Sequence, residues 1–352
     1  MKKNATILNN LHLTIALVLL IISSLAVSSY FVFVKNKDQA RQVIEEIKNE
    51  IIPECFHRSD LDGTCLSDDE QFFVYGVMID NHVEARPPAN LDKARVVYET
   101  VVEIPITRLL AVFSSQDETK KIGPVRSARP FYVDWAKEFN GLYVHVGGSN
   151  EALEIIKNSY SYDMNEFAYG NYFWRDNTYR YQPHNAFTSS ELINKLVDKN
   201  DWRIETSFDS WVYKPEAKIE DRGDAASQIE ISFQSYDFNV VWEYSQEDNA
   251  YLRYQGGRKH LTEEKDEIKA KNIAVLYTDS EVIDSYGRRR YETVGSGRAI
   301  VFNDGVAVDG TWQRPDLSSR TRFYDENNKE ISLNPGTTWI EILPDYYPEV
   351  IY

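Results

Sequence analysis

The sequence predicts an α/β N-terminal domain followed by a smaller, mostly β C-terminal domain, behind an N-terminal transmembrane helix. Three observations predict this fold class: an uncharged apolar run near the N-terminus, strand patterns that alternate with helix patterns up to residue 213, and short strand patterns alone after residue 227. A chain of 352 residues is long enough for two domains of ordinary size. The predicted divisions are a cytoplasmic start (1–10), a transmembrane anchor (11–34), a stalk with a disulfide loop (35–71), the α/β domain (72–213), a linker (214–227) and the mostly β domain (228–347).

The apolar run from Leu13 to Val34 predicts the location of the protein. It carries no formal charge and is long enough to cross a bilayer, which takes roughly 20 apolar residues in a helix. Lys2 and Lys3 favour a cytoplasmic N-terminus, and hence a single-pass protein of the cell membrane with an extracytoplasmic ectodomain. The tripeptide Ala-Val-Ser at 26–28 could be a cleavage site, but the apolar run continues past it, which favours a retained signal-anchor over a cleaved signal.

Cys55 and Cys65 are the two cysteines of the chain, and they follow the apolar run. Outside the cytoplasm the environment is oxidising, so we expect a disulfide between them, which would stabilise the fold by roughly 2–3 kcal/mol through loop closure. Two free thiols are the alternative. Asp60 and Asp62, followed by Gly63, resemble part of a calcium loop, but the full spacing is absent and a tight turn is expected instead.

Strand and helix patterns alternate along the first domain. Strands are expected at 72–79, 96–103, 106–115 and 142–148, the second and third of them forming a hairpin. Helices are expected from an N-cap at Ser127 through Phe139, from Ser149 through Lys157, and from Ser189 or Ser190 through Lys199. The second domain shows strand patterns only, at 229–233, 239–244, 251–254, 272–278, 298–303 and 337–343.

The charge of the chain argues against nucleic acid as a partner. The chain has 55 acidic and 39 basic residues and a net charge of -16, whereas broad nucleic-acid binding needs an excess of basic groups. The expected partners are therefore the membrane, through the N-terminal helix, an anionic ligand of the cell envelope, and other envelope proteins. Phosphate-binding and dinucleotide-binding glycine motifs are absent from the sequence, and no cofactor is predicted.

Polar candidates for a site gather at the ends of predicted strands in the first domain. In the segment IGPVRSARP, Arg126 and Arg129 stand three apart where a helix is predicted to begin, which would place both guanidinium groups on one side. With the free N–H groups of a helix N-terminus they would clamp a phosphate or carboxylate. Pairing of both arginines with Glu99, Glu103 or Asp134 is the alternative. The predicted ligand-binding set also includes Arg86, Arg108, His184 and Asn185.

The candidates for acid/base chemistry are Asp80, Glu99 and His184. Histidine is the usual proton carrier near neutral pH, and Asp80 with His82 and His184 could also hold a divalent metal. However, no HExxH motif is present, and the histidines at 82, 145 and 184 are far apart in sequence. Separate structural histidines are the alternative, and no metal site is predicted.

Several runs of sequence are distinctive: VMIDNHVEARPPANLDKARVVYE, ITRLLAVFSSQ, KIGPVRSARPFYVDWA, YVHVGGSNEAL, PHNAFTSSE, FNDGVAVDGTW and NPGTTWIEILP. Over nearly all of residues 72–345 they resemble the YerB-like family of bacterial envelope proteins. The resemblance implies an α/β domain followed by a smaller C-terminal domain, and it implies no particular activity. Members of that family are often lipoproteins. This chain departs from them because no cysteine lies near its apolar run, so a helical anchor is expected.

Three hypotheses of function follow. The first is an envelope protein that binds an anionic ligand near the membrane. The second is an envelope transferase or hydrolase acting on a lipid-linked phosphate or wall precursor, with Asp80 or Glu99 as base. The third is a non-catalytic interaction module. A loose similarity to transferases of the LytR-CpsA-Psr type, at the level of fold analogy, rests on the order of Asp80, Arg86, Arg108, Arg126 and Arg129.

Overall fold

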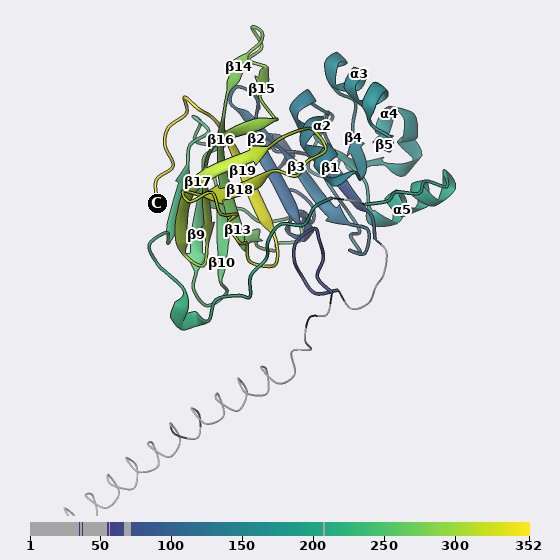
Figure 1. Cartoon of the computed structure of the whole chain (residues 1–352). Coiled ribbons are helices and arrows are strands. Elements are labelled where there is room, and N and C mark those ends of the chain that lie inside the picture. Colours follow the sequence, from purple (N-terminus) through teal and green to yellow (C-terminus); the bar gives the residue numbers. More distant parts are fainter. Residues whose placement is uncertain (1–34, 36, 38–54, 56, 67–71, 207) are drawn as a thin grey trace, which may run out of the picture. The chain divides into compact units, whose positions relative to one another are not determined.

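Strands from both parts of the chain join in one ten-stranded mixed sheet in the computed structural model (Figure 1). The order across it is β18-β17-β16-β13-β19-β2-β3-β1-β4-β5. The first part supplies β1 (Val74–Asp80), β2 (Val96–Glu103), β3 (Ile106–Ser114), β4 (Leu142–His145) and β5 (Asp163–Asn165). The second part supplies β13 (Asn272–Thr278), β16 (Gly295–Asn303), β17 (Val306–Arg314), β18 (Arg322–Asp325) and β19 (Thr338–Pro344). The two parts meet where β19 pairs in parallel with β2.

The structure describes residues 35, 37, 55, 57–66, 72–206 and 208–352, and residues 57–352 belong to one compact unit. The predicted transmembrane segment at 11–34 lies outside the described residues, as does most of the predicted stalk. Within the described part, no helix combines the length and the apolar character that a membrane crossing requires. Both cysteines, Cys55 and Cys65, are disulfide-bonded, as predicted.

Within residues 72–206 the structure has four α-helices: α2 (Pro130–Ala136), α3 (Asn150–Ser159), α4 (Glu166–Tyr169) and α5 (Ser190–Lys199). The predicted N-caps are confirmed for two of them, because the Ser149 and Ser189 hydroxyls each accept a hydrogen bond from the backbone N–H three residues later. The predicted start of α2 is wrong. Its N-cap is Arg129 rather than Ser127, and Ser127 lies in an extended segment before the helix.

A smaller second sheet consists of strands that the second part of the chain supplies: β8 (Gln228–Ile231), β9 (Val240–Ser245), β10 (Ala250–Gln255), β11 (Arg258–Lys259) and β12 (Lys269–Ala270). Two strand pairs stand apart, β6 (Trp174–Arg175) with β7 (Ala186–Phe187) and β14 (Ser280–Val282) with β15 (Arg289–Tyr291). Short 3-10 helices occur at Val83–Ala85, Leu91–Lys93, Lys137–Phe139, Gly170–Tyr172 and Ile219–Asp221. The second part is therefore mostly β, as predicted.

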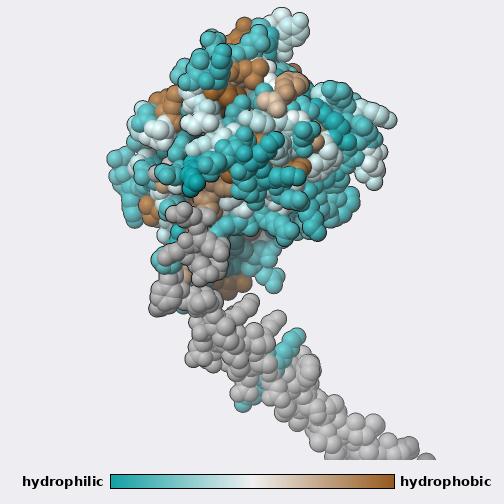
Figure 2. Space-filling view, turned by 90° about the vertical axis from the view of Figure 1, so that its right-hand side faces the viewer, coloured by the Kyte–Doolittle hydropathy of each residue, from teal (hydrophilic) through white to brown (hydrophobic). Residues whose placement is uncertain are grey.

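The large sheet separates two hydrophobic cores, because successive side chains of a strand point to opposite faces. On one face Val77, Ile79 and Val97 pack with α5 and with residues of the second sheet such as Trp242. On the other face, residues such as Met78 pack with α2 and α3. The outer surface is different: Figure 2 shows a mainly hydrophilic face on which hydrophobic side chains occur in small groups.

Candidate functional site

The end of β1 supplies polar side chains to both faces of the large sheet. Asp80 is the last residue of β1 and Asn81 follows it, and both are buried. The strand alternation directs Asp80 to the face covered by α2 and Asn81 to the face covered by the second sheet. Two separate polar clusters result. We call them the Asp80 cluster (Asp80, His82, Glu84, Arg108, Arg126, His184) and the Glu99 cluster (Asn81, Glu99, Thr107, Arg253, Glu341).

An extended segment at 122–128 brings distant residues to the end of β1. The Asp80 N–H donates to the Pro124 carbonyl at 2.8 Å, and the Arg126 N–H donates to the Met78 carbonyl at 2.8 Å. On its other side this segment pairs with residues 186–188, just after His184. Gly123 is required there, since its φ is +144° and an added Cβ would lie 2.8 Å from the Ala186 carbonyl oxygen.

Asp80 is the centre of its cluster. Its carboxylate accepts hydrogen bonds from the His82 N–H at 3.0 Å and from His184 Nδ1 at 2.7 Å, and Arg126 Nε lies 3.1 Å away. Burial opposes ionisation of Asp80, but the His184 hydrogen bond and the charges of Arg108 and Arg126 outweigh burial and lower its pKa. Asp80 is therefore ionised at neutral pH and can only accept, so His184 carries a proton on Nδ1.

Arg108 adds a buried positive charge to the cluster. It stands opposite Asp80 in the β1–β3 ladder, and its guanidinium donates to the Ser127 carbonyl at 2.8 Å. Burial lowers the pKa of Arg108 to about 9, with the neighbouring charge of Arg129 as the next cause. The guanidinium is still protonated at neutral pH. Its Nε is buried without a hydrogen-bond partner, so the cluster has unused donor capacity.

The two arginines of the predicted clamp have different partners. Arg129 donates to the Glu103 carboxylate and to the Ala128 carbonyl, which matches the alternative of internal pairing. Arg126 contacts Asp80 through Nε only, with an orientation too poor for a hydrogen bond. Its two terminal NH₂ groups have no hydrogen-bond partner among the residues that the structure describes, and 23% of its side chain is exposed. The free end of Arg126 is therefore available to an external anion.

His82, Glu84 and His184 lie together at the exposed side of the Asp80 cluster. The two imidazole rings stack with their centroids 4.5 Å apart and an angle of 13° between their planes. His184 Nε2 lies 3.6 Å from a Glu84 carboxylate oxygen. Each of the three residues offers one potential metal ligand, and these atoms lie within 4.8 Å of one another. The structure therefore brings together His82 and His184, for which the sequence left open both a shared set with Asp80 and separate structural roles.

The Glu99 cluster is sealed inside the protein. Glu99 accepts hydrogen bonds from Asn81 at 3.1 Å and from Thr107 at 2.7 Å, and it pairs with the buried Arg253. Both side chains are 0% exposed, so a substrate cannot reach Glu99 in this structure. Burial, and then the charge of Glu99, raise the pKa of Glu341 to about 8. Glu99 is thus placed for a structural role and lies apart from Asp80.

Arg86 and Asn185 also lie apart from the Asp80 cluster. The Arg86 guanidinium donates to the Asn81 and Asp237 carbonyl oxygens and stacks over Phe238. The buried Asn185 side chain donates to Asn177 at 2.6 Å and accepts from Arg175, within its own loop. Of the predicted ligand-binding set, the structure therefore brings Arg108, Arg126 and His184 together, with Arg129 beside them.

His145 and the short acidic loop have local structural roles. The fully buried His145 ring contacts the Gly147 carbonyl and the Asp163 carboxylate, each at 2.7 Å. Asp62 accepts from both the N–H and the hydroxyl of Thr64 and pairs with Arg95 at 2.8 Å. The tight turn expected at Asp62-Gly63 is therefore present, and Gly63 has the φ of +71° that such a turn favours.

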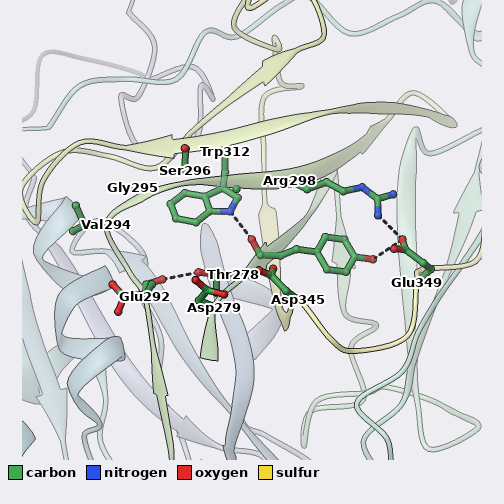
Figure 3. Close-up of a pocket in the computed structure, with 12 residues that line it drawn as sticks. Thr278, Asp279, Glu292, Val294, Gly295, Ser296, Arg298, Trp312, Asp345 and Glu349 are labelled. Carbon is green, nitrogen blue, oxygen red and sulfur yellow. Dashed lines mark hydrogen bonds and ion pairs between the residues drawn. The ribbon is translucent and has the colours of Figure 1, made fainter. Parts of the chain in front are cut away.

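A hollow of about 460 Å³ lies in the second part, between the ends of β13, β16 and β19 (Figure 3). Arg298 and the Tyr277 hydroxyl both turn to Glu349, and the Trp312 N–H donates to the Tyr277 carbonyl. The other charged residues that line it are Asp279, Glu292 and Asp345. Burial and the adjacent Asp279 raise the pKa of Asp345. This excess of acids disfavours an anionic ligand, so the Asp80 cluster is the better candidate for one.

The sequence did not single out Glu84, which the structure places beside His82 and His184. It lies two residues from His82 in a 3-10 turn (Val83–Ala85), and the i, i+2 spacing is not a helical ligand spacing. His184 comes close to Asp80 because segment 122–128 lies between the end of β1 and residues 186–188. No local sequence pattern reveals this arrangement. The run Asp80-Asn81-His82 after a buried strand was the available signal, because polar residues at strand ends often form sites.

Comparison with known proteins identifies the family. The family described as "Protein of unknown function (DUF3048)" matches with its N-terminal domain at residues 64–203 and with its C-terminal domain at residues 229–340. The chain belongs to the DUF3048 family. The Asp80 cluster falls entirely within the N-terminal DUF3048 domain.

A DUF3048 relative in Bacillus subtilis (strain 168) is named "Putative lipoprotein YerB". It is 27% identical to this chain over 274 residues, which cover 76% of this chain and 80% of the relative. The crystal structure of the YerB protein from Bacillus subtilis superposes with a TM-score of 0.74 at 25% identity, and covers 82% of this chain and 97% of that chain. The resemblance to the YerB-like family that the sequence predicted is confirmed, together with its fold.

Proposed function

We propose that this DUF3048 protein is anchored at the cell membrane and uses the Asp80 cluster to bind an anionic, phosphate-bearing ligand of the cell envelope. The observation that carries the proposal is the free end of Arg126. Its terminal NH₂ groups lack hydrogen-bond partners among the described residues, and its charge is near enough to the buried Arg108 to help lower the pKa of that group. Guanidinium groups in a partly desolvated position suit phosphate oxygens.

The balance of charge around Arg126 supports an anion. Arg108, Arg126 and Arg129 contribute three positive charges, and the nearby Asp80 and Glu103 carboxylates contribute two negative charges. The Glu84 side chain is 72% exposed, so water and salt screen its charge. A bound phosphate would neutralise the surplus charge in the less exposed part of the cluster.

Three observations support the envelope location. The apolar run at 13–34 has the length of a membrane anchor, although it lies outside the described residues. The disulfide-bonded cysteines fit an oxidising compartment. The Bacillus subtilis relative carries the name of a lipoprotein, and its attachment would place the shared domains at the same surface. Phosphate groups of lipid-linked wall precursors are available there, which makes them the ligand class we favour.

The proposal predicts that replacing Arg126 weakens binding of a prenyl pyrophosphate. The full chain in mild detergent is titrated with a short-chain prenyl pyrophosphate and with inorganic pyrophosphate in a calorimeter. A hydrogen bond to a charged group contributes about 1.5–3 kcal/mol, so Arg126→Ala should raise Kd by about 10- to 150-fold. The exposed Arg258 provides the matched control, and Arg258→Ala should leave Kd unchanged. Equal affinity of the wild type and Arg126→Ala would contradict the proposal.

The hydrogen bond from His184 to Asp80 supports a second candidate, an envelope transferase or hydrolase. A histidine whose Nδ1–H is held by a carboxylate presents Nε2 as a general base. Glu99, the other base that the sequence suggested, is a weaker candidate, because its fully buried side chain is out of reach of a substrate. Phosphate release measured in the same titration separates the two candidates: turnover that Asp80→Asn abolishes, with binding retained, would indicate an enzyme.

A further inference from the structure

His82, Glu84 and His184 have the composition of a transition-metal site. Zinc sites that carry out chemistry commonly use three nitrogen or carboxylate ligands and leave the fourth position to water or substrate. The three ligand atoms here lie within 4.8 Å of one another, and His184 Nε2 is 3.6 Å from the Glu84 carboxylate. Around a zinc ion with bonds of about 2.0–2.2 Å, ligand atoms stand roughly 3.3 Å apart, so a small closure would bring the three into range.

Asp80 gives His184 the orientation that a ligand needs. The Asp80 carboxylate accepts a hydrogen bond from His184 Nδ1 at 2.7 Å, which fixes the proton on that nitrogen and leaves a lone pair on Nε2. Metal-binding histidines almost always have such an acceptor behind them. Asp80 is 3% exposed, and it is held in turn by the His82 N–H and the charge of Arg126. The support behind His184 is therefore rigid.

We propose that His82, Glu84 and His184 bind a divalent transition metal of the zinc class, with Asp80 as the residue that positions His184. This site differs from the sequence prediction of no metal site, and it does not rest on the proposed anion function. Two imidazoles with one carboxylate select zinc-like ions over calcium or magnesium, which prefer oxygen ligands.

His82 must adjust on binding. One of its nitrogens, Nδ1, accepts a hydrogen bond from the Glu84 N–H at 3.2 Å, so the neutral ring carries its proton on the other nitrogen. Ligation requires release of this contact, which is long and exposed to water.

Zinc chloride alone is the probe for this proposal. The full chain in detergent is stripped with a chelator and dialysed, and zinc binding is followed by calorimetry and by the shift in Tm. We expect one zinc per chain and a Tm that rises with zinc concentration, because a ligand of the folded state stabilises it. His184→Ala and Glu84→Gln should each abolish the Tm shift or weaken binding at least about 100-fold, and Asp80→Asn should weaken it about 10- to 100-fold.

The controls separate the metal site from folding defects. The exposed Glu118 is matched to Glu84, and Glu118→Gln should bind zinc as the wild type does. Each variant is also melted without zinc, and those that keep the wild-type Tm report on binding alone. His82→Ala provides an independent variant, because its ring is only partly buried and its loss should spare the fold. Absence of stoichiometric zinc on the wild type, or unchanged affinity in His82→Ala and Glu84→Gln, would overturn the proposal.

Discussion

At the scale of single residues, the polar chemistry of this protein divides between the two faces of one sheet. Asp80 is ionised and contacts His184 and Arg126 near solvent, whereas Asn81 binds the enclosed Glu99. Asp80 and Glu99 therefore differ in whether a ligand from solvent can reach their partners. A charge near the surface can exchange partners with a ligand, while a fully buried ion pair is costly to break once formed.

Glu341, which is buried beside Glu99, predicts a pH dependence of the free energy of unfolding. The pKa of Glu341 is raised from 4.5 to about 8, so the folded protein holds a proton that the unfolded chain releases above pH 4.5. The contribution of Glu341 to the free energy of unfolding is therefore largest below pH 4.5, and it is lost as the pH rises towards 8. Across this window the wild type should lose on the order of 4 kcal/mol relative to Glu341→Gln, which stays neutral. Urea unfolding of both proteins at several pH values measures the difference; parallel pH profiles would contradict it.

Several site residues could be predicted from the sequence and several could not. Asp80, Arg108, Arg126 and His184 were selected because they end strands or follow them, and the structure brings them together. Other candidates lie apart from this cluster. Glu99 is in phase with Val97 and Val101 on the opposite face of the sheet. Arg86 contacts Asn81 and Asp237, and Asn185 contacts Asn177 within its own loop. Strand phase could have separated Glu99 from Asp80, whereas the approach of His184 depends on tertiary structure.

At the scale of elements, local chemistry predicted most helices and strands. Ser149 and Ser189 cap the helices expected of them. The predicted start of α2 at Ser127 was wrong, although Pro130 indicates a later start. The residue before a proline disfavours helical backbone angles, so a helix seldom extends across that position. Arg129 precedes Pro130 and has φ −132° and ψ 149°, so the helix cannot include the earlier residues. Arg126 and Arg129 consequently stand on an extended segment and not on one helix.

β17 is not among the strands expected of the second domain, because the Asp309-Gly310 pair is typical of a turn. The structure places Gly310 inside β17, where a Cβ would lie 1.9 Å from the Tyr324 carbonyl oxygen of β18. A glycine inside a strand often marks such a close approach of another backbone. The turn that separates β16 from β17 lies instead at Asp304-Gly305.

Gly310→Ala should therefore destabilise the protein. The added methyl group can be accommodated only if the backbone of β18 moves, and overpacking of this kind costs about 1–3 kcal/mol. Gly170→Ala is the matched control, because an added Cβ there meets no atom within 4 Å, and its effect should stay within about 0.5 kcal/mol. Urea unfolding of the two variants gives the comparison, and an equal effect of both would show that β18 does not pack on Gly310 as described.

At the scale of the whole molecule, the two family domains share one sheet. The parallel pairing of β19 with β2 places Trp339 opposite Val97, and Trp242 of the second sheet donates to Glu341 across the same core. The sequence predicted an α/β part and a β part, and it predicted the character of each. It could not show that the sheet continues between them, because strand patterns do not identify partners so far apart in the chain.

The central claim is that the Asp80 cluster holds an anionic envelope ligand through Arg126. Native mass spectrometry of the full chain, purified in mild detergent from its own membranes, tests this most directly. The wild type and Arg258→Ala should retain a phosphate-containing adduct, and Arg126→Ala should lose it while remaining folded. An adduct of equal abundance on all three proteins, or its absence from the wild type, would contradict the account.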